Sequence, residues 1–391
     1  MIRKALKGVY IIMKKLLVMI LAALLVCGCI LPHAMAEAQG DYQYTVKEDG
    51  TAEITKVNKD CKDSVIPAEL DGHKVTSIGA HAFSTCKNMK IDAIPEGITA
   101  IGEGAFMYCD KIQSIKLPDS LTTIGEMAFS FCGNLQSVNI PDSVTEIGEG
   151  VFMNSPKLKA IEISRENPAY VFNSKALISK KDRVMICYLD PRGGDYEIPW
   201  GITRIGLGAF CGSKVKSVVI PDSVVSVGPQ AFWDCKNMMD IYIPHSVTSI
   251  DNQAFLQCAK LKTVAIPDSV TEIGKGVFSW CKNLETVQIS ADHPVYELKD
   301  SLLIRKADGR LISALPSIKG SCQIPDGVQS IEDMAFSGCE KMKELIIPAS
   351  VKEITGFIFT GSNRLVCKVT AGTYAEQYCE EYGVKHETIS K

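Results

Sequence analysis

Cysteine is the residue type in this sequence whose spacing most directly suggests chemistry. At seven places a cysteine stands three residues after a recurring phenylalanine: Cys86, Cys109, Cys132, Cys235, Cys258, Cys281 and Cys339. Such a series could bind metal ions or form a ladder of disulfides. No CxxC pair and no histidine at ligand spacing accompanies it, whereas packing of a small side chain at one inward position per repeat explains the series fully. We therefore interpret these cysteines as buried thiols.

The remaining cysteines offer one further possibility. The chain has 15 cysteines, of which Cys27 and Cys29 lie in an apolar leader, so 13 remain and at least one must be unpaired. Cys367 and Cys379, both in the last segment of the chain, are the only pair that we would test for a disulfide.

Other catalytic patterns are missing from the sequence. It contains no HExxH, no GxSxG and no Walker loop. Gly206, Gly208 and Gly212 imitate a dinucleotide-binding loop, but glycines at the same repeat positions elsewhere, such as Gly148 and Gly150, show that turn geometry explains them. The histidines are scattered: His33, His73, His81, His245, His293 and His386. We predict a non-enzymatic protein without a metal or cofactor, and keep an unrecognised hydrolase as a remote alternative.

A repeated segment explains most of the chain. Ile140–Phe152 reads IPDSVTEIGEGVF, and Ile266–Phe278 repeats it with one change. The phenylalanine that ends the segment recurs at intervals of 22 or 23 residues, interrupted by two intervals of 58; its ten positions are Phe83, Phe106, Phe129, Phe152, Phe210, Phe232, Phe255, Phe278, Phe336 and Phe359. A period in the twenties predicts a solenoid in which stacked units share one core.

The pattern within a unit predicts its local structure. Around Leu135–Ile140 the apolar residues alternate with polar ones, which indicates a short strand, and Pro141 ends it because proline has no N–H to donate. A turn and a second extended piece follow. Residues 150–155 are too few for a long helix and are predicted to form one helical or 3₁₀ turn. The fold class is thus an α/β repeat solenoid, built mainly of short β-strands with short helical turns, in one elongated domain.

The ends of the array are predicted to be capped. Residues 37–65 contain two alternating runs around Asp49-Gly50, which predict a β-hairpin over the first unit. The ten repeats occupy 66–370. In residues 371–391, Thr373 and Glu376 have the spacing of a capping box, so we expect a helix over 374–382 and a closing strand after it.

Two insertions account for the long intervals. They lie near 164–198 and 290–324 and contain related text, with Tyr170 and Tyr296 at matching positions. Each reads as a β-hairpin, and we expect both hairpins to project from one face of the rod. They could form a binding ridge, or they could be spacers that the solenoid tolerates.

The N-terminus has the layout of a secretory signal. Two lysines precede the apolar run Leu16–Leu31, and Ala34-Met35-Ala36 offers a cleavage site, so residues 1–36 are predicted to be a signal peptide. The alternative is a lipoprotein in which Cys29 is lipidated. Either ending places the mature chain outside the cell or on its surface. Five of the 42 basic side chains lie in this leader, which leaves 37 basic against 45 acidic groups and a net charge of −8, and this balance argues against nucleic-acid binding.

The outward positions of the predicted strands are the candidate binding surface. They are mostly small and polar, and Tyr242 is the one aromatic side chain among them. The candidate ligand-binding residues are Lys116, Asn139, Glu162, Asp240, Tyr242, Gln288 and Glu344.

The repeat IPxSVTxIGxxAFxxCxxL resembles the BspA-type leucine-rich repeats of bacterial and protist surface proteins, over roughly residues 66–370. The resemblance implies an exported protein that binds protein or glycan ligands, such as host extracellular-matrix proteins, in adhesion or co-aggregation. It carries little functional detail because the repeated residues are structural. A self-assembling structural module of the cell surface is the alternative.

Overall fold

The computed structural model describes residues 37–61, 65–362 and 364–389. The predicted signal peptide and Cys29 lie outside these residues. In the described part of the chain, no helix is long and apolar enough to cross a membrane.

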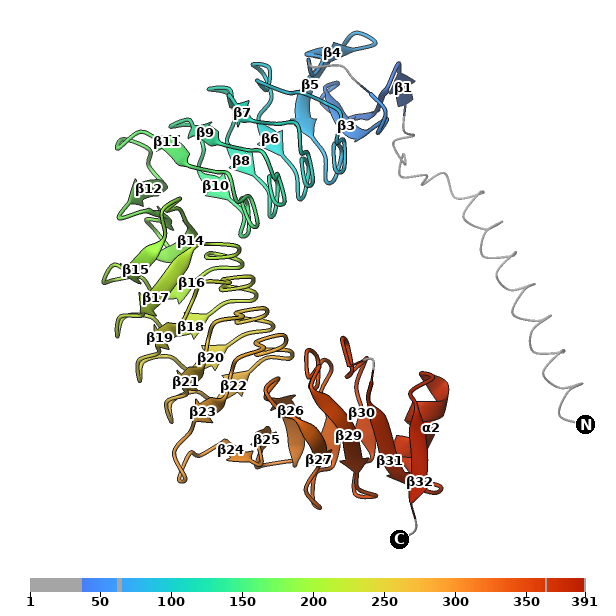
Figure 1. Cartoon of the computed structure of the whole chain (residues 1–391). Helices are drawn as coiled ribbons and strands as arrows, with labels where there is room; N and C mark the ends of the chain where they lie inside the picture. The colour runs from blue at the N-terminus through green and yellow to red at the C-terminus, as the bar shows by residue number, and fades with distance from the viewer. Residues whose placement is uncertain (1–36, 62–64, 363, 390–391) are drawn as a thin grey trace, which may run out of the picture.

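The chain forms a curved solenoid whose coils stack along an arc (Figure 1). Each coil contributes two short strands, and strands of successive coils pair in parallel, so that the solenoid has two rows of strands. The row toward the concave side, called the inner row, comprises β5 (His73–Ile78), β6 (Ala100–Ile101), β8 (Thr123–Ile124), β10 (Glu146–Ile147), β14 (Val184–Tyr188), β16 (Arg204–Ile205), β18 (Ser226–Val227), β20 (Ser249–Ile250), β22 (Glu272–Ile273), β26 (Arg310–Ala314), β28 (Ser330–Ile331) and β30 (Glu353–Ile354).

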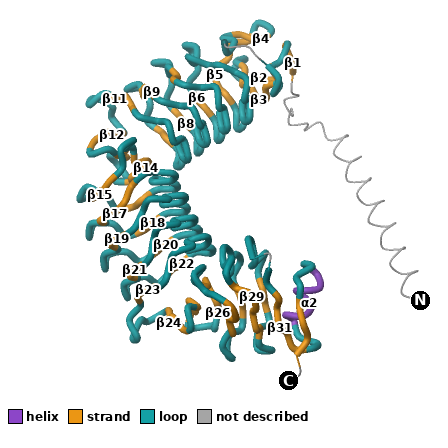
Figure 2. The backbone as a smooth tube through the Cα atoms, in the orientation of Figure 1, coloured by secondary structure: helices purple, strands orange, loops and turns teal. Residues whose placement is uncertain are grey.

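The second row, called the outer row, follows the convex side of the arc. Its members are β7 (Ser114–Ile115), β9 (Ser137–Ile140), β11 (Ala160–Ile163), β15 (Gly194–Glu197), β17 (Val215–Val219), β19 (Asp240–Tyr242), β21 (Thr263–Ala265), β23 (Thr286–Gln288), β27 (Gly320–Gln323), β29 (Met342–Ile347), β31 (Val366–Thr370) and β32 (His386–Ile389). Figure 2 shows that loops line the concave edge.

These loops contain no helical turn, so the predicted helical or 3₁₀ turn is wrong. Residues 150–155 form turns, and the only helix in the described residues is α2 (Tyr374–Glu381). In nine of the ten repeats the residues two before and two after the anchoring phenylalanine adopt positive φ; around Phe255 they are Gln253 (φ 57°) and Gln257 (φ 62°). A right-handed helix excludes such residues, and the left-handed conformation instead reverses the chain within a few residues.

The turns are held by hydrogen bonds to the next coil. The backbone N–H groups of Gln230, Phe232 and Asp234 donate to carbonyl oxygens of the following coil, at 2.9, 2.8 and 2.9 Å. The intervening N–H groups close turns within their own coil, as Trp233 does to the Gln230 carbonyl at 3.0 Å. Every buried backbone donor of this corner is thereby satisfied without a helix or a strand.

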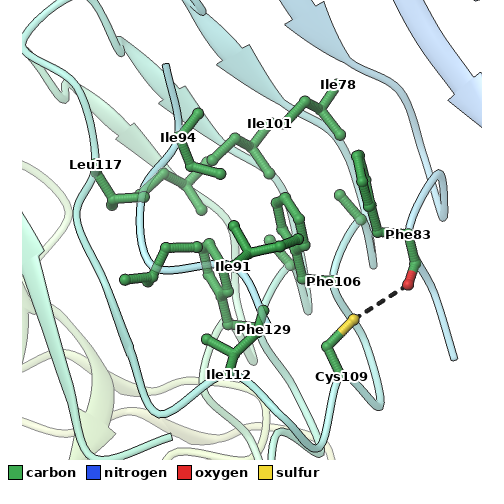
Figure 3. Close-up of a cluster of buried hydrophobic side chains, with 14 of the residues drawn as sticks. Ile78, Phe83, Ile91, Ile94, Ile101, Phe106, Cys109, Ile112, Leu117 and Phe129 are labelled. Atoms are coloured by element: carbon green, nitrogen blue, oxygen red, sulfur yellow. Dashed lines mark hydrogen bonds between the residues drawn. The ribbon is translucent and has the colours of Figure 1, made fainter. Parts of the chain in front are cut away.

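The anchoring phenylalanines stack on one another inside the coils (Figure 3). The ring centroids of Phe83 and Phe106 are 5.0 Å apart, and those of Phe106 and Phe129 are 5.2 Å apart with an interplanar angle of 4°. Each of these rings is fully buried. The predicted shared interior is therefore present, and the aromatic stack follows the coil spacing of a parallel sheet, about 4.8 Å.

The interior is divided into three clusters instead of one continuous spine. The first phenylalanine stack ends at Phe152, the second begins at Tyr188 with Phe210 at 4.9 Å, and the third contains Phe336 and Phe359 at 6.0 Å. The two divisions coincide with the two long intervals of the sequence. We call them the first and second junctions.

At each junction the chain forms a three-stranded antiparallel meander. The first contains β12 (Tyr170–Asn173), β13 (Ala176–Ser179) and β14; the second contains β24 (Tyr296–Lys299), β25 (Leu302–Arg305) and β26. The last strand of each meander pairs in parallel with the next inner strand, and β13 and β25 are largely buried. The expectation of hairpins that project from the rod is therefore wrong, because their apolar residues complete the core.

Both ends of the solenoid are covered. β1 (Glu37–Gln39), β2 (Tyr42–Val46) and β3 (Ala52–Val57) form an antiparallel sheet that continues into β5, and β4 (Glu69–Leu70) pairs with β5. At the other end α2 and β32 close the stack, β32 in parallel with β31. The predicted capping box is not formed: the Thr373 hydroxyl donates to the Thr370 carbonyl at 2.6 Å, while the Glu376 carboxylate accepts from the Gly372 N–H at 2.7 Å.

We predict that Phe255→Ala lowers the free energy of unfolding by about 3–5 kcal/mol, because it opens a cavity in the middle of an aromatic stack. Urea denaturation followed by circular dichroism measures the loss. The exposed Lys262→Ala in the next coil is the control and should change stability by less than about 0.5 kcal/mol. A loss below about 1 kcal/mol for Phe255→Ala would show that the stacked rings are not the stabilising core.

Candidate functional site

The cysteine series forms a column that serves the interior. Cys258 is fully buried, and its thiol donates to the Phe232 carbonyl of the preceding coil at 3.1 Å; Cys109, Cys132, Cys235 and Cys281 make the equivalent bond at 3.0–3.1 Å. Figure 3 shows the bond of Cys109. At Ser155, where serine replaces cysteine, the hydroxyl donates to the Phe129 carbonyl at 3.1 Å. The thiol of the column is thus a second donor to the phenylalanine carbonyl, which also accepts a backbone N–H within its own turn, as Phe232 does from Cys235 at 3.2 Å.

Burial also makes these thiols unreactive. Loss of solvent raises the pKa of Cys132 to about 12 and that of Cys339 to about 12, because an interior thiolate has no water to stabilise it. Metal binding and nucleophilic attack both require the thiolate. No group of three or more potential metal ligands occurs among residues 37–61, 65–362 and 364–389.

A small cavity at the first junction is not a ligand site. It has a volume of about 80 Å³ and is lined by residues of both clusters, including Tyr188, Cys211 and the buried Asp190. Asp190 is already neutralised, since its carboxylate lies 2.6 Å from the ammonium group of Lys175. Sites for small organic ligands usually have several hundred cubic ångströms, so this space is too small.

The structure does not bring all the candidate ligand-binding residues together. In the first group of coils, Asn139 and Glu162 are on outer strands and Lys116 directly follows β7. Asp240, Tyr242 and Gln288 are on outer strands of the second group, and Glu344 is on one of the third. Lys116, Glu162, Asp240, Tyr242 and Gln288 are exposed. The junctions separate the three groups, so they are not one continuous surface.

Two of these residues are engaged within the protein. The Asn139 side chain accepts from the Leu117 N–H at 2.9 Å and donates to the Leu117 carbonyl at 3.4 Å, which joins neighbouring coils. Glu344 forms an ion pair with Lys368 at 2.9 Å and accepts from the Ser321 hydroxyl at 3.0 Å. Both side chains are half-buried and stabilise the outer row, so they are weaker candidates for ligand contact than the sequence suggested.

Tyr242 has the surroundings expected of a contact residue. Its side chain is 55% exposed, and in the parallel register it lies beside Val219, which is 42% exposed. An open groove of about 290 Å³ runs along it, lined also by His245, Ala265 and Asp268. The alternation of the strand presents these side chains outward, while Ile241 packs into the core.

Trp200 extends this surface and was missed from the sequence. It is 80% exposed, the largest value among the exposed large apolar side chains of the described chain. Trp200 directly follows Ile198-Pro199, as Asp222 follows Ile220-Pro221 and His245 follows Ile243-Pro244, so the three residues occupy the same turn of successive coils. The signal in the sequence is that tryptophan replaces the aspartate of the IPDS turn. The periodicity of the strands does not reveal this replacement, because it lies in a turn.

Carboxylates surround these apolar side chains. Asp195 and Glu197 on β15, Asp222 and Asp268 in the turns, and Asp240 on β19 are all exposed. None of the five forms an ion pair with another described residue. We call Trp200, Val219, Tyr242, Ala265 and these five carboxylates the outer patch; it combines exposed aromatic side chains with carboxylates that form no ion pair among the described residues.

Comparison with known proteins identifies the repeat. Residues 60–178, 194–302 and 317–379 match the model of the BspA type leucine rich repeat region, in six copies. This chain belongs to the BspA-type leucine-rich repeat family. The unmatched segments 179–193 and 303–316 fall within the two junctions.

Several solved structures are similar to this BspA-type chain. A leucine rich cell surface protein from Faecalibacterium prausnitzii A2-165 is 27% identical, with 85% of this chain and 77% of that chain covered and a TM-score of 0.37. The pneumococcal vaccine antigen PcpA is 18% identical over 91% and 97%, with a TM-score of 0.48. A leucine-rich repeat protein from Eubacterium ventriosum is 19% identical over 84% and 89%, with a TM-score of 0.43. No curated protein matches this sequence significantly.

We predict that the buried cysteine column makes the BspA-type solenoid sensitive to alkali. Because burial raises the pKa values of Cys132 and Cys339 in the folded state, the folded protein holds their protons more tightly. Their contribution to stability is complete below the unfolded thiol pKa of about 8.5 and falls as pH rises toward 12. Urea denaturation between pH 7 and pH 10.5 measures this loss.

Cys132→Ser is the matched control, since serine occupies the same position at Ser155 and keeps the bond to a carbonyl. The substitution should reduce the slope of the free energy of unfolding against pH by up to about 1.4 kcal/mol per pH unit. Identical pH profiles for the variant and the native protein would contradict the assignment.

Proposed function

We propose that this protein is an exported surface protein that binds a protein partner through the outer patch and catalyses no reaction. The observation that carries the proposal is the exposure of Trp200 and Tyr242 on the same side of the second group of coils, two coil steps apart, or about 10 Å along the solenoid. Tryptophan and tyrosine are the residues most often found to dominate binding energy at protein interfaces.

A binding role is also supported by the interior, because the repeated residues serve the packing of the coils and the surface residues do not. The phenylalanines, the cysteines and the isoleucines of the strands are buried and bonded to neighbouring coils. The residues that differ from the repeat on the surface, such as Trp200 and His245, are free to vary with the partner. A rigid scaffold with variable surface residues is the usual arrangement for recognition.

The charge of the outer patch indicates the chemistry of the partner. Five carboxylates without ion-pair partners surround the aromatic side chains, and a partner with lysine or arginine side chains around an apolar centre would compensate them. We therefore propose a basic segment of an extracellular protein as the ligand. The export predicted from the leader and the membership of a family with surface-protein relatives are consistent with an extracellular partner.

We expect Trp200→Ala and Tyr242→Ala each to weaken binding by at least about 2 kcal/mol, or roughly 30-fold, since truncating an anchor leaves its pocket on the partner empty. Binding of the mature chain to a panel of immobilised extracellular-matrix proteins provides the measurement. Tyr374→Ala is the control, because Tyr374 is also an exposed aromatic residue (40%) but lies in the C-terminal cap.

Equal effects of the three substitutions would argue against the outer patch. If the protein bound none of the panel and light scattering showed concentration-dependent association, the structural self-assembling module would be favoured. Turnover in an untargeted substrate screen would overturn the non-catalytic assignment.

The carboxylates should govern association more than dissociation. We expect the combined change Glu197→Gln, Asp222→Asn and Asp268→Asn to slow association about 3- to 10-fold at low salt, with little effect at 0.5 M salt, where surface charges are screened. Stopped-flow or surface plasmon resonance at two ionic strengths measures this. The change Asp119→Asn with Asp142→Asn, at equivalent turns of the first group of coils, should have no effect.

A further inference from the structure

Two cysteines meet beneath the C-terminal cap. Cys367 belongs to β31 and Cys379 to α2, and both side chains are fully buried in the third core cluster. Both are free thiols in this structure, and they interact directly with each other. The backbone reinforces the contact, because the N–H of Cys367 donates to the Lys385 carbonyl at 2.9 Å and the Cys379 carbonyl accepts from Val384 at 2.8 Å.

We propose that Cys367 and Cys379 are a redox pair that forms a disulfide on exposure to a disulfide oxidant, and that this bond fastens the helix α2 to the last coil. The inference is independent of the outer patch. It concerns the end of the solenoid, where the core is covered by α2 and by the pairing of β32 with β31.

The backbone arrangement of this pair differs from that of neighbouring thiols in the cysteine column, where Cys258 also interacts with Cys235 and Cys281. Neighbouring members of the cysteine column, such as Cys258 and Cys281, are related by one coil step, so their Cα–Cβ bonds are parallel and their Cβ atoms are separated by the coil spacing of about 4.8 Å. A disulfide needs a Cβ–Cβ separation of about 3.5–4.5 Å and converging bonds. Cys367 and Cys379 instead come from a strand and from a helix, and their backbones bond to the adjacent residues Lys385 and Val384, which places the two cysteines on either side of one short segment.

The electrostatics of the pair favour exchange. The hydrogen bond from Cys367 lowers the pKa of the Cys379 thiol, with a smaller contribution from His386, and the same interaction raises the pKa of Cys367. Burial raises the pKa of the other thiols for which the structure shows a shift, for example Cys187 and Cys322. The lower pKa favours Cys379 as the attacking thiol, because the thiolate is the reactive form.

The reaction balances with one disulfide oxidant, such as oxidised glutathione or the disulfide of an extracellular thiol oxidoreductase. The Cys379 thiolate attacks a sulfur of the oxidant and expels one thiolate, which forms a mixed disulfide. Cys367 loses its proton and attacks the Cys379 sulfur, which forms the protein disulfide and expels the second thiolate. The protein loses two electrons and two protons, and the oxidant is reduced to two thiols. Since both sulfurs are buried, the oxidant reaches them before α2 docks or when the cap opens.

The bond would link residues 12 positions apart and would restrict the cap to conformations near the folded one. It would also hold Tyr378, whose ring lies 6.4 Å from Phe359 and whose hydroxyl donates to the Gly356 carbonyl at 3.2 Å. The aromatic stack of the third cluster would thus be closed covalently at its open end.

Peptide mapping of the full chain tests the proposal. Purified protein is incubated with oxidised glutathione, its remaining thiols are blocked with N-ethylmaleimide in denaturant, and it is cut with trypsin. Cleavage at Lys368 separates Cys367 in residues 365–368 from Cys379 in 369–385. We expect these two peptides joined and two hydrogen atoms lighter than their sum, while the peptides of Cys258 and Cys281 carry N-ethylmaleimide. Blocked thiols on both cap peptides, or a bond within the column instead, would overturn the proposal.

Hydrogen exchange provides the second measurement. In the oxidised protein the amides of α2 should exchange about 10- to 100-fold more slowly than in the dithiothreitol-treated protein. Cys367→Ser, which cannot form the bond, should show no difference between the two conditions. An equal response of Cys367→Ser and the native protein would mean that the oxidant acts elsewhere.

Discussion

Hydrogen bonding between the turns of successive coils is the interaction on which the structure depends. A residue such as Phe232 is held at two levels: its N–H donates to the Ala254 carbonyl at 2.8 Å, and its ring lies 5.4 Å from that of Phe255. The first contact sets the spacing at which the second can form. Every coil must therefore present a donor, a ring and a small residue such as Cys258 in the same order, which explains why these interior positions repeat so regularly.

The two junctions show how the same interruption can be packed in different ways. At the first junction Asn154 faces Gly212, Gly208 meets Met153, and Glu149 forms an ion pair with Arg204. At the equivalent place in the second junction Trp280 lies against Gly338 and Gly361. A Cβ atom on Gly338 would overlap the Trp280 backbone, and one on Gly361 would overlap the indole ring. The backbone N–H of Trp280 donates to the Ser337 carbonyl at 3.2 Å. The second junction is filled by one large side chain. The first keeps a small polar cavity, and the buried Asp190 there needs Lys175 to neutralise it.

Sequence reasoning found what repeats and missed what depends on unusual backbone conformations. The positions of Phe129 and Phe255 in the core followed from their spacing alone, as did the stacking of the coils. The turns were predicted as helical because Gln257 and Trp280 are not residues that normally indicate positive φ, yet they adopt φ of 62° in this structure. Inter-coil hydrogen bonds compensate this strain, and no local pattern shows such bonds. Trp200 was missed for a different reason. It stands where other repeats have the aspartate of the IPDS turn, and the periodicity of the strands gives no information about substitutions in turns.

The arrangement of the outer row also explains why some candidate ligand-binding residues bond within the protein and others remain exposed. Asn139 and Glu344 are outward in strand periodicity, but their side chains are long enough to bond along the row to Leu117 and Lys368. A parallel row brings every outward side chain within reach of the equivalent residue one coil away, so polar side chains of complementary type bond to each other and stabilise the scaffold. Tyr242 lies beside Val219, and Trp200 occupies the turn next to that of Asp222. The side chains of neither pair are of complementary polar type, so they do not bond to each other along the row. Exposed residues that lack a complementary neighbour in the row are thus the ones left for an external partner, and they occur together in the second group of coils.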